Sequence, residues 1–241
     1  MKVSAYKKEF AYSYAIGVFA TIELLEHQTT AVTQVLLHSK GDKNSGVEKI
    51  RKYCKENNIP LEIADRQVEQ LSKSENTYAI GFFEKYESRV MDQENHLMLV
   101  NPSDTGNLGT IIRTALGFGI KNLIIIRPGV DIFDPKVIRA SQGGVFQMNV
   151  LYLDSFDAYK KMFSNTCYPF MLDGKVSLEE VRFEKPYTLI FGNEGSGLDA
   201  SYQEIGTSIR IPQTENIDSL NLAISAGIGL YKAYISRHSG E

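Results

Sequence analysis

Residues 189–198, LIFGNEGSGL, join an uninterrupted apolar run directly to a glycine-rich loop. Such a run is typical of a parallel strand that is buried on both faces, and the glycines let the backbone approach a ligand closely. Their spacing matches neither the dinucleotide-binding fingerprint nor a Walker A loop. Because an unpaired buried carboxylate is costly, we expect Glu194 to face solvent, a cation or hydrogen-bond donors. The segment therefore predicts a parallel α/β sheet with a ligand loop and gives no support for a nicotinamide cofactor.

Apolar strands alternate with helices through the rest of the C-terminal half. This order predicts a parallel sheet with helices on both faces. The predicted strands span residues 96–100, 122–126, 146–151, 168–172, 188–191 and 208–211. The predicted helices span residues 107–118, 134–139, 154–163, 199–204 and 219–236.

The N-terminal half also alternates, and a charged stretch separates it from the rest of the chain. We expect helices over residues 10–26, 47–57 and 65–71 and strands over residues 32–37, 61–64 and 77–83. Residues 84–96 carry many charges and few apolar side chains, which is typical of a linker. The sequence therefore predicts a substrate-binding domain over residues 1–93 and a second domain over residues 94–241.

A second segment, residues 101–115 (NPSDTGNLGTIIRTA), follows a predicted strand and opens a helix. In a parallel sheet this places it at the carboxyl edge, where ligands bind, and the free N–H groups of a helix N-terminus suit a phosphate. Arg113 follows Gly109 by four residues and Gly106 by seven, so the three share one helix face. Taken alone, the segment fits equally well a capped helix with an ordinary surface arginine.

A third segment, residues 211–228 (IPQTENIDSLNLAISAGI), leads from a strand end through a polar loop into a helix. Asp218 or Ser219 is the expected N-cap of this helix. Its small residues permit close packing against another element. Taken alone, it also fits an ordinary capped helix, as residues 189–198 also fit a plain glycine turn.

Composition limits the classes of protein to consider. The chain has 241 residues, a net charge of −3, 43% hydrophobic and 23% charged residues, as in ordinary globular proteins. It shows no apolar run near the roughly 18 residues of a membrane span and no secretory signal block, so we expect a cytoplasmic protein. Cys54 and Cys167 lack metal-ligand spacing, which predicts reduced structural cysteines and no metal site. An RNA site would need a local basic patch; candidates that also fit solvated faces are Lys7-Lys8, Lys49–Lys52 and Lys160-Lys161.

The three segments in this order resemble the SpoU (TrmH-like) branch of the SPOUT RNA methyltransferases. The family's Asn-x-Gly-x-x-x-Arg motif falls on Asn107, Gly109 and Arg113, its Gly-Asn-Glu-Gly-x-Gly motif on residues 192–197, and its Ile-Pro and Ser-Leu-Asn motifs on residues 211–212 and 219–221. The stretch 139–146 resembles a further family segment. The resemblance is close over residues 96–236. It implies a deep trefoil knot near the C-terminus, a homodimer, and a small N-terminal α/β domain that is similar to ribosomal proteins and binds RNA.

The resemblance also implies an activity and a set of site residues. The activity is the S-adenosylmethionine-dependent 2′-O-methylation of a ribose in RNA, with ribosomal RNA favoured and transfer RNA as the alternative. The implied cofactor-binding residues are Gly192, Asn193, Gly197, Ile211 and Leu220. The implied catalytic residues are Arg113, Asn107, Glu194, Ser219 and Asn221. Two other readings stay open, namely a knotted RNA-binding protein without activity and a knotted enzyme that methylates a base nitrogen.

Overall fold

The structure is a computed structural model that describes residues 4–72 and 76–236. The chain forms two compact units. Unit 1 comprises Met1–Glu87 and Asp131–Gln147, and unit 2 comprises Ser88–Val130 and Met148–Glu241. Each unit has its own sheet, and each is described by itself.

Unit 2 is built on a five-stranded parallel sheet. Its strand order is β7-β6-β5-β10-β8, and each neighbouring pair is parallel. Every residue of the three central strands is buried, as the apolar runs predicted. The strands are β5 (His96–Val100), β6 (Asn122–Ile126), β7 (Asn149–Leu153), β8 (Thr166–Pro169) and β10 (Tyr187–Phe191).

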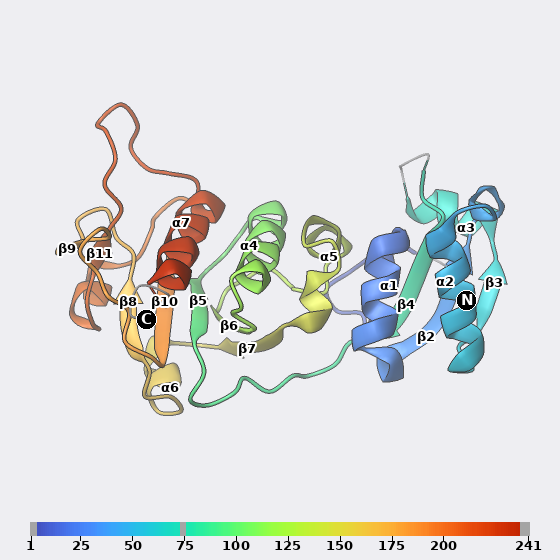
Figure 1. Ribbon diagram of the computed structural model, residues 1–241, viewed down its shortest axis with the longest axis horizontal. Helices are drawn as coiled ribbons and strands as arrows, with labels where there is room; N and C mark the ends of the chain where they lie inside the picture. The colour runs from blue at the N-terminus through green and yellow to red at the C-terminus, as the bar shows by residue number, and fades with distance from the viewer. Residues whose placement is uncertain (1–3, 73–75, 237–241) are drawn as a thin grey trace. The chain divides into compact units, whose positions relative to one another are not determined.

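Helices cover both faces of this sheet, as predicted (Figure 1). Helices α4 (Thr105–Gly117) and α7 (Leu222–Ile235) pack against each other on one face. On the other face, Tyr159 of α6 (Phe156–Lys160) joins a buried cluster with Ile190. Because side chains alternate along a strand, Ile190 and its neighbour Phe191 point to opposite faces.

Three expectations for unit 2 were wrong in detail. The strand expected over 208–211 is not a sixth member of the main sheet, because β11 (Ile209–Arg210) pairs with β9 (Val176–Ser177) in a separate two-stranded sheet. The helix expected over 199–204 is a 3₁₀ helix, η4 (Ala200–Glu204). Strand β7 begins at Asn149 rather than 146, because Gly144–Gln147 forms a 3₁₀ turn, η3.

Unit 1 contains a four-stranded sheet with the order β1-β4-β2-β3. Strand β4 is antiparallel to β1 and β2, and β3 is parallel to β2. The carboxyl ends of β1, β2 and β3 therefore lie at one edge, where helices α1, α2 and α3 begin. The elements are β1 (Tyr12–Ile16), α1 (Val18–His27), β2 (Val32–Leu37), α2 (Ser45–Glu56), β3 (Leu61–Ile63), α3 (Asp65–Leu71) and β4 (Ala79–Glu84).

The helix expected over residues 10–26 is wrong in its first half. Residues 12–16 form β1, and the helix begins only at Val18. Gly17 lies between them with φ 102°, a backbone conformation that glycine adopts easily and that separates the strand from the helix.

The segment Asp131–Gln147 packs within unit 1, although the predicted boundary near residue 93 puts it in the second domain. Its helix α5 (Pro135–Ala140) contacts β1, and η3 contacts α1. The Ser13 hydroxyl donates to the Phe133 carbonyl at 2.6 Å, and the Lys85 ammonium pairs with Asp131 at 2.9 Å. The domain boundary near residue 93 itself stays a prediction, as does the knot.

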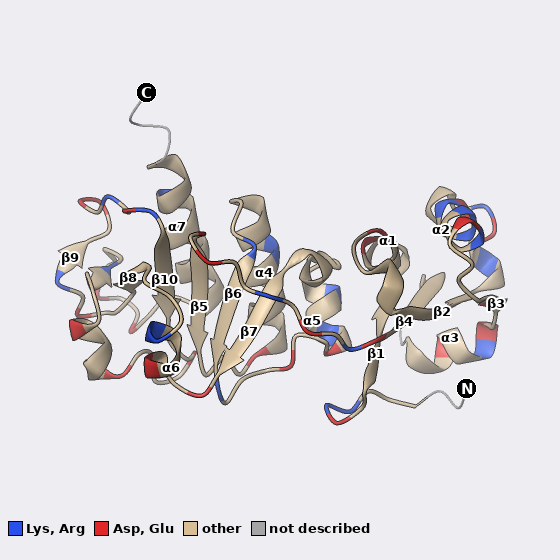
Figure 2. Ribbon diagram, turned by 90° about the horizontal axis from the view of Figure 1, so that it is seen from below, with Lys and Arg blue, Asp and Glu red and all other residues tan. Residues whose placement is uncertain are grey.

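The distribution of charged residues, the helices and the two cysteines are those of an ordinary globular chain. Lys and Arg are interspersed with Asp and Glu along both units (Figure 2). Within residues 4–72 and 76–236, no helix combines the length and the apolar character that crossing a bilayer requires. Cys54 and Cys167 are free and buried, and burial raises the pKa of each thiol to about 11.

Candidate active site

The Glu194 carboxylate joins the first two motif segments. Its Oε2 accepts hydrogen bonds from the Ser103 N–H at 3.1 Å and the Ser103 hydroxyl at 2.8 Å. Its Oε1 accepts from the Asp104 N–H at 3.1 Å and from Asn107 Nδ2 at 3.3 Å. Glu194 thus faces hydrogen-bond donors, one of the three environments expected from its sequence.

The environment of Glu194 favours its ionised form. Partial burial acts to raise the pKa of this carboxyl, but the hydrogen bonds from its own backbone N–H, from Ser103 and from Asp104 outweigh burial and lower the pKa below 4.5. Hydrogen bonds that stabilise a carboxylate have this effect generally. Glu194 is therefore a charged anchor at neutral pH, with its oxygens already engaged.

Two asparagines extend this network to the third segment. Asn221 Nδ2 donates to Asn107 Oδ1 at 3.1 Å, and Asn107 in turn donates to Glu194. Asn221 Oδ1 also accepts from the Ala223 N–H at 2.8 Å, so Asn221 is the N-cap of α7. The expectation that Asp218 or Ser219 caps this helix was wrong. Residues from all three motif segments therefore form one hydrogen-bonded chain.

The glycine loop turns back on itself directly after β10. Asn193 and Gly197 form a two-residue antiparallel bridge with backbone hydrogen bonds of 3.0 and 3.2 Å. A Cβ added at Gly192 would lie 2.1 Å from the Gly197 carbonyl carbon, so a side chain at 192 would force this turn open. The Asn193 side chain fixes the turn by accepting from the Gly195 N–H at 2.8 Å and donating to the Asn101 carbonyl at 2.7 Å.

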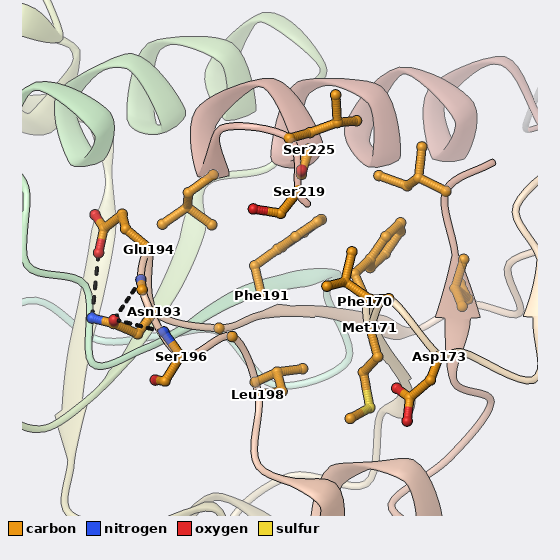
Figure 3. A pocket seen from close by; sticks show the side chains of 18 of the residues that line it. Phe170, Met171, Asp173, Phe191, Asn193, Glu194, Ser196, Leu198, Ser219 and Ser225 are labelled. Atoms are coloured by element: carbon orange, nitrogen blue, oxygen red, sulfur yellow. Dashed lines mark hydrogen bonds between the residues drawn. The ribbon is translucent and has the colours of Figure 1, made fainter. Parts of the chain in front are cut away.

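A pocket of about 390 Å³ opens beside this loop, at the carboxyl ends of β8 and β10 (Figure 3). Its lining includes two predicted catalytic residues, Glu194 and Ser219, and all five predicted cofactor residues: Gly192, Asn193, Gly197, Ile211 and Leu220. Ligand pockets of parallel sheets lie at this edge, and pockets for small ligands are about 300–1,000 Å³.

Sequence reasoning missed one wall of the pocket. Phe170, Met171 and Asp173 follow β8 and line it. Phe170 stacks on Phe191 with ring centroids 4.3 Å apart, and Figure 3 shows the two rings beside Ser219. The available signal was that residues after β8 must lie at the same sheet edge as those after β10.

Arg113 lies apart from this network. It is on the third turn of α4 and is exposed. Its guanidinium has no hydrogen bond or ion pair with any residue in the part of the chain that the structure describes. Arg113 does not line the pocket, so all of its donors are available to a ligand.

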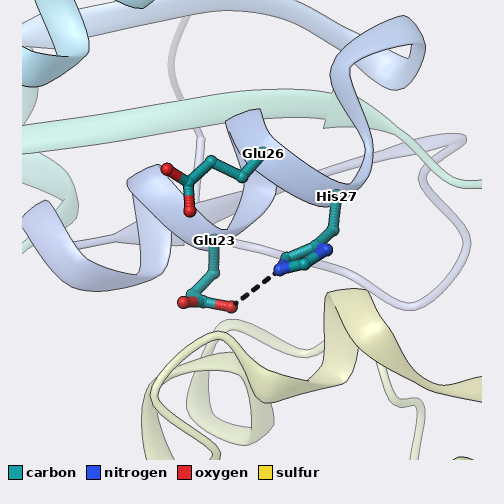
Figure 4. Close-up of side chains that lie close together, drawn as sticks. All are labelled: Glu23, Glu26 and His27. Carbon is teal, nitrogen blue, oxygen red and sulfur yellow. Dashed lines mark ion pairs between the residues drawn. The ribbon is translucent and has the colours of Figure 1, made fainter.

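One cluster in unit 1 has the composition of a metal site. Single ligand atoms of Glu23, Glu26 and His27 lie within 4.8 Å of one another (Figure 4). Each carboxylate already has a partner, because Glu23 accepts from Gln147 at 2.7 Å and Glu26 pairs with Lys49 at 2.6 Å. His27 lies 3.4 Å from Glu23. Protein groups thus account for this cluster, and it gives no reason to infer a metal.

The fold and pocket define a parallel α/β protein whose ligand loops follow the carboxyl ends of its strands. The chain belongs to the SpoU rRNA Methylase family, whose model matches residues 94–231. Residues 14–78 match the family described as RNA 2′-O ribose methyltransferase substrate binding. The resemblance to SpoU methyltransferases is thereby confirmed.

Individual relatives agree with this assignment. The chain is 36% identical over 141 residues to an uncharacterized tRNA/rRNA methyltransferase of Synechocystis, covering 57% of this chain and 52% of the relative. It is 32% identical to a 23S rRNA (adenosine(1067)-2′-O)-methyltransferase of Streptomyces laurentii, covering 53% and 49%. The chain thus spans about half the length of these relatives.

A solved structure matches nearly the whole chain. It is the AdoMet-bound rRNA methyltransferase of Sinorhizobium meliloti, with a TM-score of 0.80 and 27% identity. The match covers 96% of this chain and 89% of the other. The α/β fold predicted from the sequence is therefore confirmed for both parts of the chain.

Proposed function

We propose that this protein catalyses the S-adenosylmethionine-dependent 2′-O-methylation of a ribose in RNA. One observation carries the proposal: hydrogen bonds join Glu194, Asn107 and Asn221 at the side of a pocket whose lining contains every expected cofactor residue. Ribosomal RNA is the proposed substrate class, because the Streptomyces laurentii relative acts on 23S rRNA by name. Transfer RNA is the alternative.

The residues of the pocket fit the proposed cofactor. The stacked rings of Phe170 and Phe191 provide an apolar wall, and the absence of a side chain at Gly192 leaves the backbone of the loop accessible. Backbone groups of Gly192, Asn193, Gly197, Ile211 and Leu220 would hold the cofactor. When bound, S-adenosylmethionine supplies an activated methyl group on its positively charged sulfur.

The remaining task of the protein is to align the ribose and to assist removal of its hydroxyl proton. We assign Arg113 to the phosphate next to the reacting ribose, because its exposed guanidinium is unpaired and presents a planar set of donors. A guanidinium does not deprotonate readily, so we do not make Arg113 the base. Asn107 and Ser219 would contact the ribose or its phosphate.

Glu194 is a positioning residue in this scheme. Its lowered pKa and its hydrogen bonds from Ser103, Asp104 and Asn107 suit an anchor better than a proton acceptor. The hydroxyl proton would instead leave to phosphate or water. Asn221, at the start of α7, would hold the Asn107 side chain in place.

The proposed partners are RNA and a second copy of the chain. An apolar strip on α7 supports a homodimer, since Ile224 is 55% and Tyr231 53% exposed. Exposed apolar side chains that lie together are typical of interaction surfaces. We propose a cytoplasmic protein, where ribosomal RNA is available to it.

The test of the activity is transfer of a labelled methyl group to total RNA from cells that lack this gene. We expect labelling, and alkaline hydrolysis should show protection 3′ to one nucleotide because a 2′-O-methyl blocks cleavage there. Labelled RNA without protection would indicate base methylation and refute ribose chemistry. A chain that gives no heat on titration with S-adenosylmethionine would be a binding module.

The role of Arg113 has its own test. We expect Arg113→Lys to retain the charge but lose the bidentate hydrogen bond to the phosphate, so that turnover falls at least tenfold. Near-normal rates with an unchanged pH–rate profile would remove the phosphate clamp from the mechanism.

A further inference from the structure

Phe19 is the most exposed large hydrophobic side chain in the part of the chain that the structure describes. It is 79% exposed in the first turn of α1. A single exposed apolar residue is ordinary on a protein surface, but this one lies at the sheet edge where β1, β2 and β3 end. Within unit 1, this is the edge at which ligands of α/β sheets bind.

The first turns of α1 and α2 touch at this edge. A Cβ added at Gly46 would lie 2.4 Å from Val18 Cγ1, so there is no space between the helix starts. The loop that leads into α2 therefore ends next to the turn that carries Phe19. This loop, residues 38–44, contributes Lys40 and Lys43, which are both exposed.

The charges at this edge leave the two lysines available. Asp42 is engaged by Arg51 at 2.6 Å, and Asp65 accepts from the Ser39 hydroxyl at 2.6 Å. The Lys40 backbone N–H donates to His38 Nδ1 at 3.1 Å, but the ammonium groups of Lys40 and Lys43 form no hydrogen bond or ion pair within residues 4–72 and 76–236. The edge thus combines an exposed aromatic ring with two ammonium groups that have no salt bridge, and the carboxylates of Asp42 and Asp65 already have other partners.

We propose that Phe19, Lys40 and Lys43 form the surface of unit 1 that binds an unpaired nucleotide of the RNA substrate. The base stacks on the Phe19 ring and the lysines bind the flanking phosphates. Aromatic stacking beside a cationic groove is how proteins hold single-stranded RNA. The match of residues 14–78 to a substrate-binding family supports RNA as the occupant. The proposal rests on the proposed function.

The chain contains no tryptophan, so Phe19→Trp introduces a single fluorescent reporter that can still stack. We expect a single-stranded 12-nucleotide oligoadenylate to quench its emission more than a 12-base-pair RNA duplex does. Met91→Trp is the matched control, because Met91 is 46% exposed and lies in unit 2, outside the basic pairs that the sequence offers. Its emission should not respond to either RNA.

Substitutions separate the contribution of base stacking to RNA affinity from the contribution of the lysine charges. Phe19→Leu keeps an apolar side chain but loses the flat ring, so we expect the KM for RNA to rise about tenfold or more, and Phe19→Tyr should restore most of the affinity. Lys40→Gln and Lys43→Gln should each lower the slope of log affinity against log salt by about 0.7. Lys55→Gln, at the other end of α2, should leave that slope unchanged.

The outcomes distinguish this surface from the activity. Quenching at position 19 in a protein that methylates no RNA would refute the proposed function but would still support RNA binding at this surface. Methylation with an unquenched Trp at 19 and an unchanged KM in Phe19→Leu would refute the surface and keep the function. Quenching that follows protein concentration without RNA would assign Phe19 to a contact between copies and overturn the proposal.

Discussion

Replacing Glu194 with glutamine should loosen the cofactor pocket without removing any atom that lines it. The amide can keep one oxygen toward Ser103, but its NH₂ group then faces the Asp104 N–H and Asn107 Nδ2, which donate at 3.1 and 3.3 Å. Two donors lose their acceptor and meet a third donor. The change therefore removes two charge-assisted hydrogen bonds that tie the glycine loop to the start of α4.

Hydrogen bonds to charged groups contribute about 1.5–3 kcal/mol each. Glu194 is only partly buried, so water can replace some of what is lost, and we expect about 2–4 kcal/mol in total. If this energy keeps the loop in its binding conformation, the apparent affinity for S-adenosylmethionine falls with the fraction of ordered loop. We expect at least tenfold weaker binding in isothermal titration at pH 7.5.

The control and the pH dependence sharpen this test. Glu180→Gln removes an exposed carboxylate outside the pocket and should bind cofactor as the wild type does. Because the pKa of Glu194 is lowered from 4.5, its stabilising effect is complete above that pH and is lost as the pH falls through the folded-state pKa. The stability difference between wild type and Glu194→Gln should therefore shrink in acid. Cofactor affinity within twofold of wild type at pH 7.5 would refute the anchoring role.

Three other changes test separate parts of the fold. Gly192→Ala should abolish cofactor binding while leaving most of the circular dichroism spectrum intact, because its Cβ would lie 2.1 Å from Gly197; tight binding by this variant would contradict the closed turn. Tyr86→Phe should raise the free energy of unfolding by about 1 kcal/mol, measured by urea titration, because the buried hydroxyl has no hydrogen-bond partner among the described residues; a loss of stability would show that this hydroxyl does have one. Burial lowers the pKa of His96 from 6.5 despite the opposing hydrogen bond to Met91. The unfolded chain therefore binds the proton at a higher pH than the folded chain does, so the free energy of unfolding should fall as the pH drops below 6.5. If the free energy of unfolding of His96→Gln falls equally steeply with pH, this histidine is not the cause.

The sheet of unit 2 was predictable because its central strands are apolar apart from one residue near the start of each, namely His96, Asn122 and Thr188. Such runs admit no amphipathic alternative, so β5 and β6 were predicted at their observed bounds. Strand β1 was not, because Tyr12–Ile16 is buried on both faces and Phe10, Tyr14 and Val18 also fit a helical period. Only the backbone conformation of Gly17 marks where the strand ends and the helix begins, and a φ angle cannot be read from the sequence.

The family resemblance implied five cofactor-binding residues, and all five line the pocket: Gly192, Asn193, Gly197, Ile211 and Leu220. The hydrogen bonds that join the three segments were not predicted. The hydrogen bonds from Ser103 to Glu194 and from Asn221 to Asn107 join residues that are 91 and 114 positions apart in the sequence, and no spacing rule reaches that far. The N-cap of α7 was misplaced for the same reason, since Asn221 is fixed by both its helix and Asn107.

The position of α7 in the chain has a consequence for synthesis of the protein. Leu222 and Ser225 complete the lining of the pocket, so a nascent chain that has emerged only as far as the glycine loop presents that loop with one side open. Under the proposed function, such a chain would lack part of the wall that holds S-adenosylmethionine, so it would become active only after α7 has been made. If the substrate is ribosomal RNA, an incomplete copy would then leave the ribosome that is making it unmodified.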